Sequence, residues 1–302
     1  MNDRVRITDV APRDGLQSEP KRIPADAKVR LIDAIALAGV DEIEITSFVS
    51  PRWIPQLGDA AEVCAALGER KPTGVVFSAL VPNERGMERL LEVNEGAGGG
   101  LIDRIAVFTA ASETFSQRNT NASIAETLGR FRPVVGGATE RGMGVRGYVS
   151  CAVKCPYEGD VEPARVADVA GRLVDLGVDE IDLGDTIGAG TPATITAAIE
   201  AVRAALPDHI TLTVHLHDTF GKAGACVRAA LDAGVRSFDA ASAGLGGCPF
   251  ASTPHCRAPG NISLCALVEA IEGAGLSTGV DHDAMRGAAD MARDLLDAGA
   301  PS

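Results

Sequence analysis

The chain has 302 residues, of which 46% are hydrophobic and only 4% aromatic, as in a globular protein with an aliphatic core. Its formal net charge of −13 argues against nucleic acid and anionic membrane as partners, because a net negative field repels both. No apolar run reaches the ~20 residues of a membrane span, and the N-terminus MNDRVRITDV does not resemble a signal peptide. Seven cysteines, an odd number, do not predict a disulfide framework, so we expect a reducing, cytoplasmic compartment.

Strand-like and helix-like segments alternate along the chain. Most apolar, β-branched runs are followed by a segment whose apolar residues recur near every 3.6 positions, as in a helix. At Gly39, Gly177 and Gly234 the sequence reads as a helix end, a left-handed glycine cap and a new strand. Eight such units match the roughly 250 residues of a closed (β/α)8 barrel. The predicted strands cover residues 5–10, 42–48, 74–81, 104–110, 144–153, 180–186, 210–218 and 237–244.

The predicted fold class is therefore α/β: a (β/α)8 TIM barrel with additional C-terminal helices, forming one domain over residues 1–302. We expect the barrel over about residues 5–260 and closing helices over about 261–298. An open doubly wound sheet is the alternative, but no GxGxxG follows a strand to bind a dinucleotide. Chemistry in TIM barrels lies at the carboxyl ends of the strands, so polar residues there are candidate site residues.

The motif VHLHD places two histidines at the end of the predicted seventh strand. Residues i and i+2 of a strand point to the same face, so we expect His215 and His217 to lie side by side. With a nearby carboxylate, two imidazoles suit a divalent cation whose shell is completed by water or substrate oxygens. Two polar residues at a barrel rim, without a ligand, are the alternative interpretation.

Other predicted strand ends carry carboxylates and a cysteine. Asp14 follows the first strand in APRDGLQ, where an ordinary turn carboxylate is the alternative. Glu44 and Asp185 lie within or at the end of apolar strands, where an unpaired carboxylate is costly, so Arg13 or a metal is the expected partner. Cys248 lies in the loop GLGGCPF, whose glycines let the backbone approach a ligand, although cysteine is often a small buried hydrophobic residue.

Six successive segments resemble the sequence blocks of the 3-hydroxy-3-methylglutaryl-CoA lyase family, in the family's order and over nearly the whole chain. The HxHD and RDG elements are shared more widely, with Claisen-type synthases and aldolases on related metal-dependent barrels. SFVSPRWIPQ and GGCPFA resemble the lyase branch more closely. The segments are APRDGLQ, EITSFVSPRWIPQLGD, YVSCAVKCPYEG, DLGDTIGAGTP, VHLHDTFGKA and AGLGGCPFA.

The resemblance implies a retro-Claisen lyase that cleaves 3-hydroxy-3-methylglutaryl-CoA into acetyl-CoA and acetoacetate with Mg²⁺ or Mn²⁺. Asp14, His215 and His217 match the family's metal ligands. Asn261 in PGNIS matches a fourth ligand, with a helix N-cap as the alternative role. The cation would bind the substrate's 3-hydroxyl and a carboxylate oxygen, and would thereby lower the pKa of that hydroxyl.

The resemblance also implies roles for the other candidates. His215, or a metal-bound water oriented by Glu44 and Asp185, would take the hydroxyl proton. Arg13 would stabilise the enolate oxygen that forms as the carbon–carbon bond breaks. Cys248 would act as a thiol and protonate the enolate of acetyl-CoA, and no lysine or arginine adjoins it in its glycine loop to favour the thiolate.

Substrate binding is predicted for Arg13, Gln17 and Lys154. Lys154 stands in SCAVKCPYEG at a position where the family more often has glycine. The loop from Cys248 to Asn261 is longer than the family's usual version. Both features leave open a related 3-hydroxyacyl-CoA with a different branch at C3.

Further alternatives are a Claisen-type synthase or aldolase of the same superfamily, and a non-catalytic barrel, which would be expected to have lost catalytic residues. The expected partner is an acyl-CoA substrate, without nucleic acid or membrane, and a homodimer is compatible with the sequence. Candidates for contacts to the CoA phosphates are Lys21, Arg22, Arg52 and Lys222.

Overall fold

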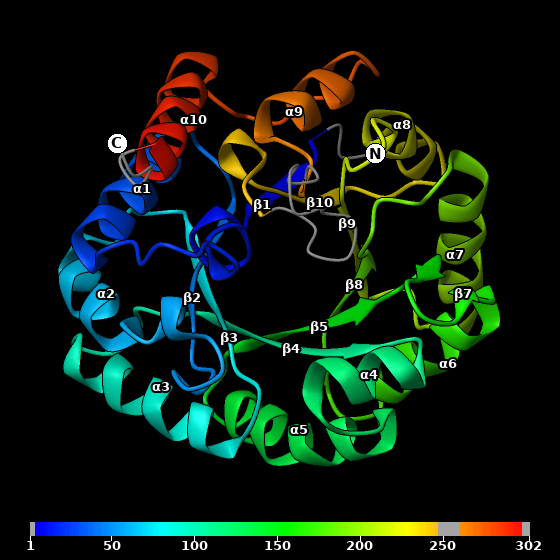
Figure 1. Cartoon of the computed structure of the whole chain (residues 1–302), viewed down its shortest axis with the longest axis horizontal. Helices are drawn as coiled ribbons and strands as arrows, with labels where there is room; N and C mark the ends of the chain where they lie inside the picture. Colours follow the sequence, from blue (N-terminus) through cyan, green and yellow to red (C-terminus); the bar gives the residue numbers. More distant parts are fainter. Residues whose placement is uncertain (1–3, 247–259, 298–302) are drawn as a thin grey trace.

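Eight parallel strands close into a barrel in this computed structural model, which describes residues 4–246 and 260–297. The order around the barrel is β1-β10-β9-β8-β5-β4-β3-β2, and helices surround it (Figure 1). The predicted TIM barrel is thus confirmed. The strands are β1 (Arg6–Asp9), β2 (Glu42–Ser47), β3 (Val76–Leu80), β4 (Arg104–Ala110), β5 (Gly144–Ser150), β8 (Glu180–Asp185), β9 (Thr211–Leu216) and β10 (Ser237–Ala240).

The helices cover the outside of the barrel because each presents an apolar face to the strands. In α6, Val166, Val169 and Leu173 recur at helical spacing, are buried, and belong to a helix that contacts β5 and β8. No described helix combines the length and apolar character needed to cross a membrane. The helices are α1 (Ala25–Leu37), α2 (Ala60–Leu67), α3 (Glu84–Gly96), α4 (Glu113–Thr120), α5 (Ile124–Thr139), α6 (Pro163–Val174), α7 (Pro192–Ala205), α8 (Ala223–Asp232), α9 (Leu264–Glu272) and α10 (His282–Asp297).

The junctions between helices and strands follow the local sequence. Gly39, Gly177 and Gly234 have φ values of 79°, 105° and 85°, which confirms the predicted left-handed caps. At the C-terminal end of the chain, α10 contacts both α1 and α9 and therefore lies between the last and the first unit of the ring (Figure 1).

Three features of the strand-to-helix loops were not predicted. A short π-helix, η1 (Ala11–Gly15), directly follows β1, and α4 is an additional helix between β4 and α5. The predicted fifth strand ran to residue 153, whereas β5 ends at Ser150. It ends there because Cys151 has a left-handed φ of 58°, and its amide donates to Thr186 Oγ1. An antiparallel hairpin of β6 (Lys154–Cys155) and β7 (Gly159–Asp160) follows.

The barrel interior contains a network of buried ion pairs around Arg146 on β5. Its Nη2 lies 2.8 Å from Glu180 Oε1 on β8 and 3.3 Å from Glu42 Oε2 on β2. Its Nη1 lies 3.1 Å from Asp239 Oδ1 on β10. Because burying an arginine is costly unless it is paired, these contacts let one charge connect four strands across the barrel.

Candidate active site

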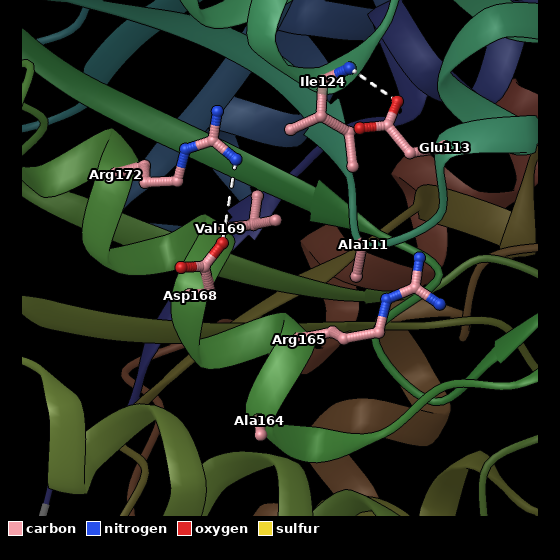
Figure 2. A pocket seen from close by; sticks show the side chains of 8 residues that line it. All are labelled: Ala111, Glu113, Ile124, Ala164, Arg165, Asp168, Val169 and Arg172. Atoms are coloured by element: carbon pink, nitrogen blue, oxygen red, sulfur yellow. Dashed lines mark hydrogen bonds and ion pairs between the residues drawn. The ribbon is translucent and has the colours of Figure 1, made fainter.

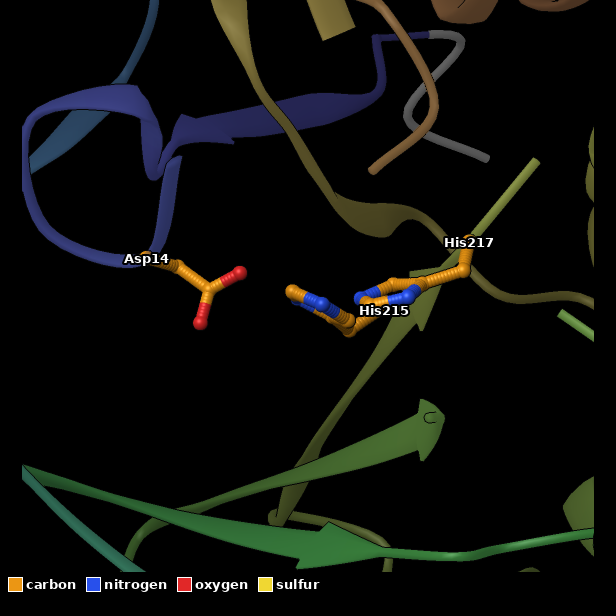
Figure 3. A group of neighbouring side chains, drawn as sticks. All are labelled: Asp14, His215 and His217. Carbon is orange, nitrogen blue, oxygen red and sulfur yellow. The ribbon is translucent and has the colours of Figure 1, made fainter. Parts of the chain in front are cut away.

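Asp14, His215 and His217 meet at the carboxyl end of the barrel, Asp14 from η1 and the histidines from the end of β9 (Figure 3). One potential ligand atom of each lies within 4.8 Å of the others. The two imidazole centroids are 5.3 Å apart, so the expected proximity of the histidines is confirmed. This group consists of donor atoms that bind divalent cations in proteins.

The protonation states of Asp14 and His217 fit a cation. Burial and the neighbouring His215 lower the pKa of His217 to about 4, so its imidazole is neutral near pH 7. His217 Nδ1 is buried and has no hydrogen-bond partner among the described residues. Burial would raise the pKa of Asp14, but the positive charge of Arg13 and the neighbouring histidines lower it to about 2. Asp14 thus supplies an ionised carboxylate, and His217 supplies a neutral imidazole with an unpartnered nitrogen.

His215 is oriented by Asp239 on the neighbouring strand β10. Its Nδ1 lies 3.1 Å from Asp239 Oδ2, which also accepts from the Tyr148 hydroxyl at 3.3 Å. Burial lowers the pKa of His215, but the hydrogen bond and the charge of Asp239 outweigh it, so the pKa is raised. With Nδ1 engaged, Nε2 is the nitrogen left for a cation or a substrate. The sequence interpretation missed Asp239, although a carboxylate within the apolar run SFDAASAG was a usable signal.

Arg13 lies between two carboxylates beside the histidines. Its Nη2 is 2.5 Å from Glu44 Oε2 and its Nη1 is 2.7 Å from Asp14 Oδ1, which confirms the expected pairing of Glu44 with Arg13. Its guanidinium carbon is 5.4 Å from the centroid of the Tyr148 ring. Burial lowers the pKa of Arg13, but the negative charges of Glu44 and Asp14 outweigh burial, so the pKa is raised. Arg13 is therefore a permanent cation held in one orientation.

Two amides complete the surroundings of Asp14. Gln17 Nε2 donates to Asp14 Oδ1 at 2.8 Å, and Asn261 Nδ2 donates to Asp14 Oδ2 at 2.8 Å. The alternative of a helix N-cap for Asn261 is wrong, because the N-cap of α9 is Ser263, whose side chain accepts from the amide of Ala266. Both amides are thus part of the cluster.

Two predicted site residues, Asp185 and Lys154, form their hydrogen bonds or ion pairs with residues outside this cluster. Asp185 accepts from the amides of Ala189 (3.1 Å) and Gly190 (2.8 Å) in the loop after β8, so its partners are backbone amides rather than Arg13. Burial outweighs these bonds and raises the pKa of Asp185 to about 6. Lys154 is half-exposed on the β6–β7 hairpin and pairs with Asp160 at 3.0 Å. Cys248 lies outside the described residues.

A cavity of about 710 Å³ opens above this cluster. Arg13 and Asp14 border it from η1 and His215 from β9, with Tyr148 of β5 beside them. Leu80 and Phe108 border it from β3 and β4. The cavity therefore has a charged side and an apolar side, and its volume is typical of a ligand site.

A second cavity of about 320 Å³ lies on the outside of the barrel, where α6 meets α4 and the start of α5 (Figure 2). Its charged side chains interact locally: Arg172 pairs with Asp168 at 3.7 Å, and Glu113 accepts from the amide of Ile124. None of the described site residues lines it.

A closed barrel with a charged, cavity-lining cluster at its carboxyl end defines a TIM-barrel enzyme with a candidate metal centre. The HMGL-like family model matches residues 4–292. The chain is 45% identical over 282 residues to the 3-hydroxy-3-isohexenylglutaryl-CoA/hydroxy-methylglutaryl-CoA lyase of Pseudomonas aeruginosa, covering 93% of this chain and 89% of that protein. It is 46% identical over 277 residues to a cytoplasmic 3-hydroxy-3-methylglutaryl-CoA lyase of Mus musculus, covering 92% and 77%.

Solved structures agree with these relatives. The HMG-CoA lyase of Brucella melitensis superposes with a TM-score of 0.89 at 46% identity, over 97% of this chain and 99% of that chain. The chain belongs to the HMGL-like family, and the resemblance found in the sequence is confirmed.

Proposed function

We propose that the chain is a 3-hydroxy-3-methylglutaryl-CoA lyase that cleaves its substrate into acetyl-CoA and acetoacetate. The observation that carries this proposal is the position of Arg13 between Asp14 and Glu44, beside two histidines at the cavity. A retro-Claisen cleavage needs an acidified hydroxyl and a stabilised enolate oxygen close together, and this arrangement supplies groups for both. Family membership supports the same reaction.

Asp14, His215 and His217 would hold Mg²⁺ or Mn²⁺, with Asn261 as a fourth ligand. The unpartnered Nδ1 of His217 and the ionised carboxylate of Asp14 fit such an ion. Because the side-chain Nδ2 of Asn261 donates to Asp14, the side-chain oxygen Oδ1 of Asn261 is the atom available as a ligand. When bound, the cation would supply Lewis acidity that lowers the pKa of the substrate's 3-hydroxyl.

The 3-hydroxyl proton goes either to His215 or to a water oriented by Glu44 and Asp185. The Nδ1 of His215 is bound to Asp239, so Nε2 is the nitrogen that would serve either the cation or the proton. With Nε2 on the cation, the oriented water would take the proton. Burial raises the pKa of Glu44, and raises that of Asp185 to about 6. A raised pKa makes either carboxylate a better base near neutral pH.

Loss of that proton forms the ketone at C3 while the bond between C2 and C3 breaks. The electron pair moves into the thioester as an enolate, whose oxygen Arg13 stabilises. One donor of this kind is worth about 10²- to 10³-fold in rate. Cys248 then protonates C2 to give acetyl-CoA. Gln17, which lines the cavity beside Asp14, contacts the acyl group, and Lys154 attracts its negative charge from outside the cavity.

A second candidate function is cleavage of a 3-hydroxyacyl-CoA with a larger branch at C3. Leu80 and Phe108 form an apolar part of the cavity wall, where a branch pointing away from the charged groups would lie. The Pseudomonas aeruginosa relative carries both an isohexenyl and a methyl substrate in its name.

The acyl-CoA is the expected partner, and we place the protein in the cytoplasm. The five described cysteines are all free, in keeping with a reducing compartment. A homodimer is compatible with the proposal.

The test is acetyl-CoA release from 3-hydroxy-3-methylglutaryl-CoA after EDTA treatment, with and without added Mg²⁺ or Mn²⁺. We expect metal-dependent release that Cys248→Ala abolishes and the control Cys265→Ala, on α9, retains. Substrates with longer C3 branches in the same assay test the second candidate. Absence of release from protein that binds Mn²⁺ would contradict the proposed substrate.

A further inference from the structure

The short helix α4 forms part of the wall of the large cavity. Phe115, Arg118 and Asn119 of this helix line the cavity. The buried residues of α4 are Phe115 and Ser116, so the helix has a small apolar face. A helix shorter than about 12 residues is marginal by itself in water. The position of this part of the wall therefore depends on what α4 packs against.

The β6–β7 hairpin contacts α4 at its amino end. Glu158 Oε1 accepts from the amide of Thr114, in the first turn of α4, at 2.7 Å. Cys155 Sγ lies 3.0 Å from the hydroxyl oxygen of Ser112, which is the N-cap of α4. A carboxylate at a helix N-terminus is stabilising because it meets unpaired amides and the positive end of the helix dipole. The hairpin thus holds the start of α4.

Tyr157, between the two strands of the hairpin, contacts α4 through its ring. The centroids of the Tyr157 and Phe115 rings are 6.3 Å apart, with an angle of 37° between the ring planes. The guanidinium carbon of Arg118 lies 4.3 Å from the centroid of the Tyr157 ring. Aromatic pairs and cation–π pairs at such distances are favourable. Tyr157 therefore touches two of the side chains with which α4 lines the cavity.

The hairpin is itself anchored to the barrel. Glu158 Oε2 lies 3.3 Å from both Nη1 and Nη2 of Arg165, which is in the first turn of α6. Lys154 and Asp160 form an ion pair at 3.0 Å across the two strands of the hairpin. Because α6 packs against β5 and β8, these contacts connect α4 to the barrel through the hairpin.

The part of the cavity that α4 borders is apolar. Phe115 lines it together with Leu80 of β3, Phe108 of β4 and Phe131 of α5. In the proposed substrate, C3 carries a hydroxyl, an arm with the thioester, an arm with a carboxylate and an apolar branch. Removing apolar surface from water is favourable, so the branch is the substituent that suits this part of the wall.

We propose that the β6–β7 hairpin holds α4 as the wall that limits the length of the branch at C3. Phe115 would lie against the branch, and Tyr157 and Glu158 would be positioning residues that act through α4. A wall fixed in this way accepts a methyl group and excludes a longer chain, whereas a wall that can move accepts both. The inference rests on the proposed function, which makes the substrate a 3-hydroxyacyl-CoA branched at C3.

The test compares two thioesters, 3-hydroxy-3-methylglutaryl-CoA and 3-hydroxy-3-butylglutaryl-CoA, whose cleavage gives acetyl-CoA and 3-oxoheptanoate. We expect the parent protein to have the higher kcat/KM for the methyl compound. In Tyr157→Ala the ratio of kcat/KM for the butyl compound to that for the methyl compound should rise about ten-fold, the effect of a methylene group in an apolar pocket. Because both thioesters are assayed with one preparation, this ratio does not depend on the fraction of folded protein. An unchanged ratio would overturn the proposal.

Conservative variants and a matched control sharpen this test. Tyr157→Phe keeps the ring against α4 and should keep the ratio of the parent protein. Glu158→Gln keeps an oxygen that accepts from the Thr114 amide, so the ratio should rise less than in Glu158→Ala. Asp160→Asn breaks the exposed pair with Lys154 in the same hairpin and should change the ratio by less than about two-fold. An equal rise in Asp160→Asn and Tyr157→Ala would contradict a specific role for the contacts with α4.

Hydrogen exchange lets the two proposals fail separately. We expect the amides of α4 to exchange faster in Tyr157→Ala than in the parent protein, and at the parent rate in Asp160→Asn. Cleavage of the methyl compound with unchanged exchange and an unchanged ratio would overturn the role of the hairpin and leave the lyase reaction standing. Faster exchange in a protein whose parent cleaves neither thioester would support the hold of the hairpin on α4 and contradict the proposed reaction.

Discussion

Two buried arginines lie near the Tyr148 ring, and they have different neighbours. Arg13 is 6% exposed and Arg146 is 1% exposed, with guanidinium carbons 5.4 and 5.8 Å from the ring centroid. Arg146 is enclosed by carboxylates of the barrel interior, such as Glu180, whereas Arg13 pairs with Glu44 and borders the cavity. The comparison indicates that a charge surrounded by protein partners supports the barrel, and a charge beside a cavity is available to a ligand.

The largest effect is expected from Arg146→Met, on stability. The variant leaves the carboxylates of Glu42, Glu180 and Asp239 buried without their common partner, and breaking a buried pair costs about 3–5 kcal/mol. Urea unfolding followed by circular dichroism measures the change in the free energy of unfolding. The control Arg293→Met, which breaks an exposed pair with Asp290, should stay within about 0.5 kcal/mol. Equal losses in both variants would show that the interior network has no special role.

Arg13→Met is expected to act on activity instead. It removes the cation proposed to stabilise the enolate oxygen, so kcat should fall by about 10²- to 10³-fold. The loss of stability should be smaller than for Arg146→Met, because Glu44 keeps the Tyr148 hydroxyl and Asp14 keeps Gln17 as donors.

Arg13→Lys separates charge from geometry in this experiment. A lysine keeps the positive charge but loses the planar donor group, so it should recover only part of kcat. Full activity in Arg13→Met, measured by acetyl-CoA release, would remove this residue from the proposed mechanism.

Of the variants Arg146→Met, Arg13→Met and Asp239→Asn, the last should have the smallest effect. Asp239 contacts both the ion-pair network of Arg146 and the site residue His215. It accepts from His215 and pairs with Arg146, so the variant loosens the imidazole without removing a ligand. Losing such a supporting carboxylate typically costs 10- to 100-fold in metal affinity. Calorimetry with Mn²⁺ measures this change apart from turnover.

Asp182→Asn is the matched control for that experiment. Burial and the neighbouring Asp239 raise the pKa of Asp182 well above its usual value, so asparagine resembles its neutral form. We expect the Mn²⁺ affinity of Asp182→Asn to stay within about three-fold of that of the parent protein. This is a smaller change than the one expected for Asp239→Asn. A larger change here than in Asp239→Asn would show that the orientation of His215 depends on something other than its hydrogen bond.

The strands could be predicted from the sequence because their signals are local. The run EIEITSF gave β2 to within a residue, and the spacing of His215 and His217 placed both imidazoles together through strand geometry alone. The end of β5 was missed, because the left-handed Cys151 is fixed by a hydrogen bond to Thr186, a residue of another unit. A pattern of apolar residues does not report such a contact.

In the candidate site, too, some features could be predicted from the sequence and others could not. The residue types at the strand ends, and the likeness to a lyase family, were readable from the sequence alone, because both are properties of short segments. Tertiary structure decided that Asp239 orients His215, since barrel closure pairs β10 with β9 in a register that sets these two residues side by side. It also decided that Asp185 faces backbone amides and that Trp53 borders the cavity. Contacts between segments far apart in the chain depend on strand register and loop packing, which no single segment encodes.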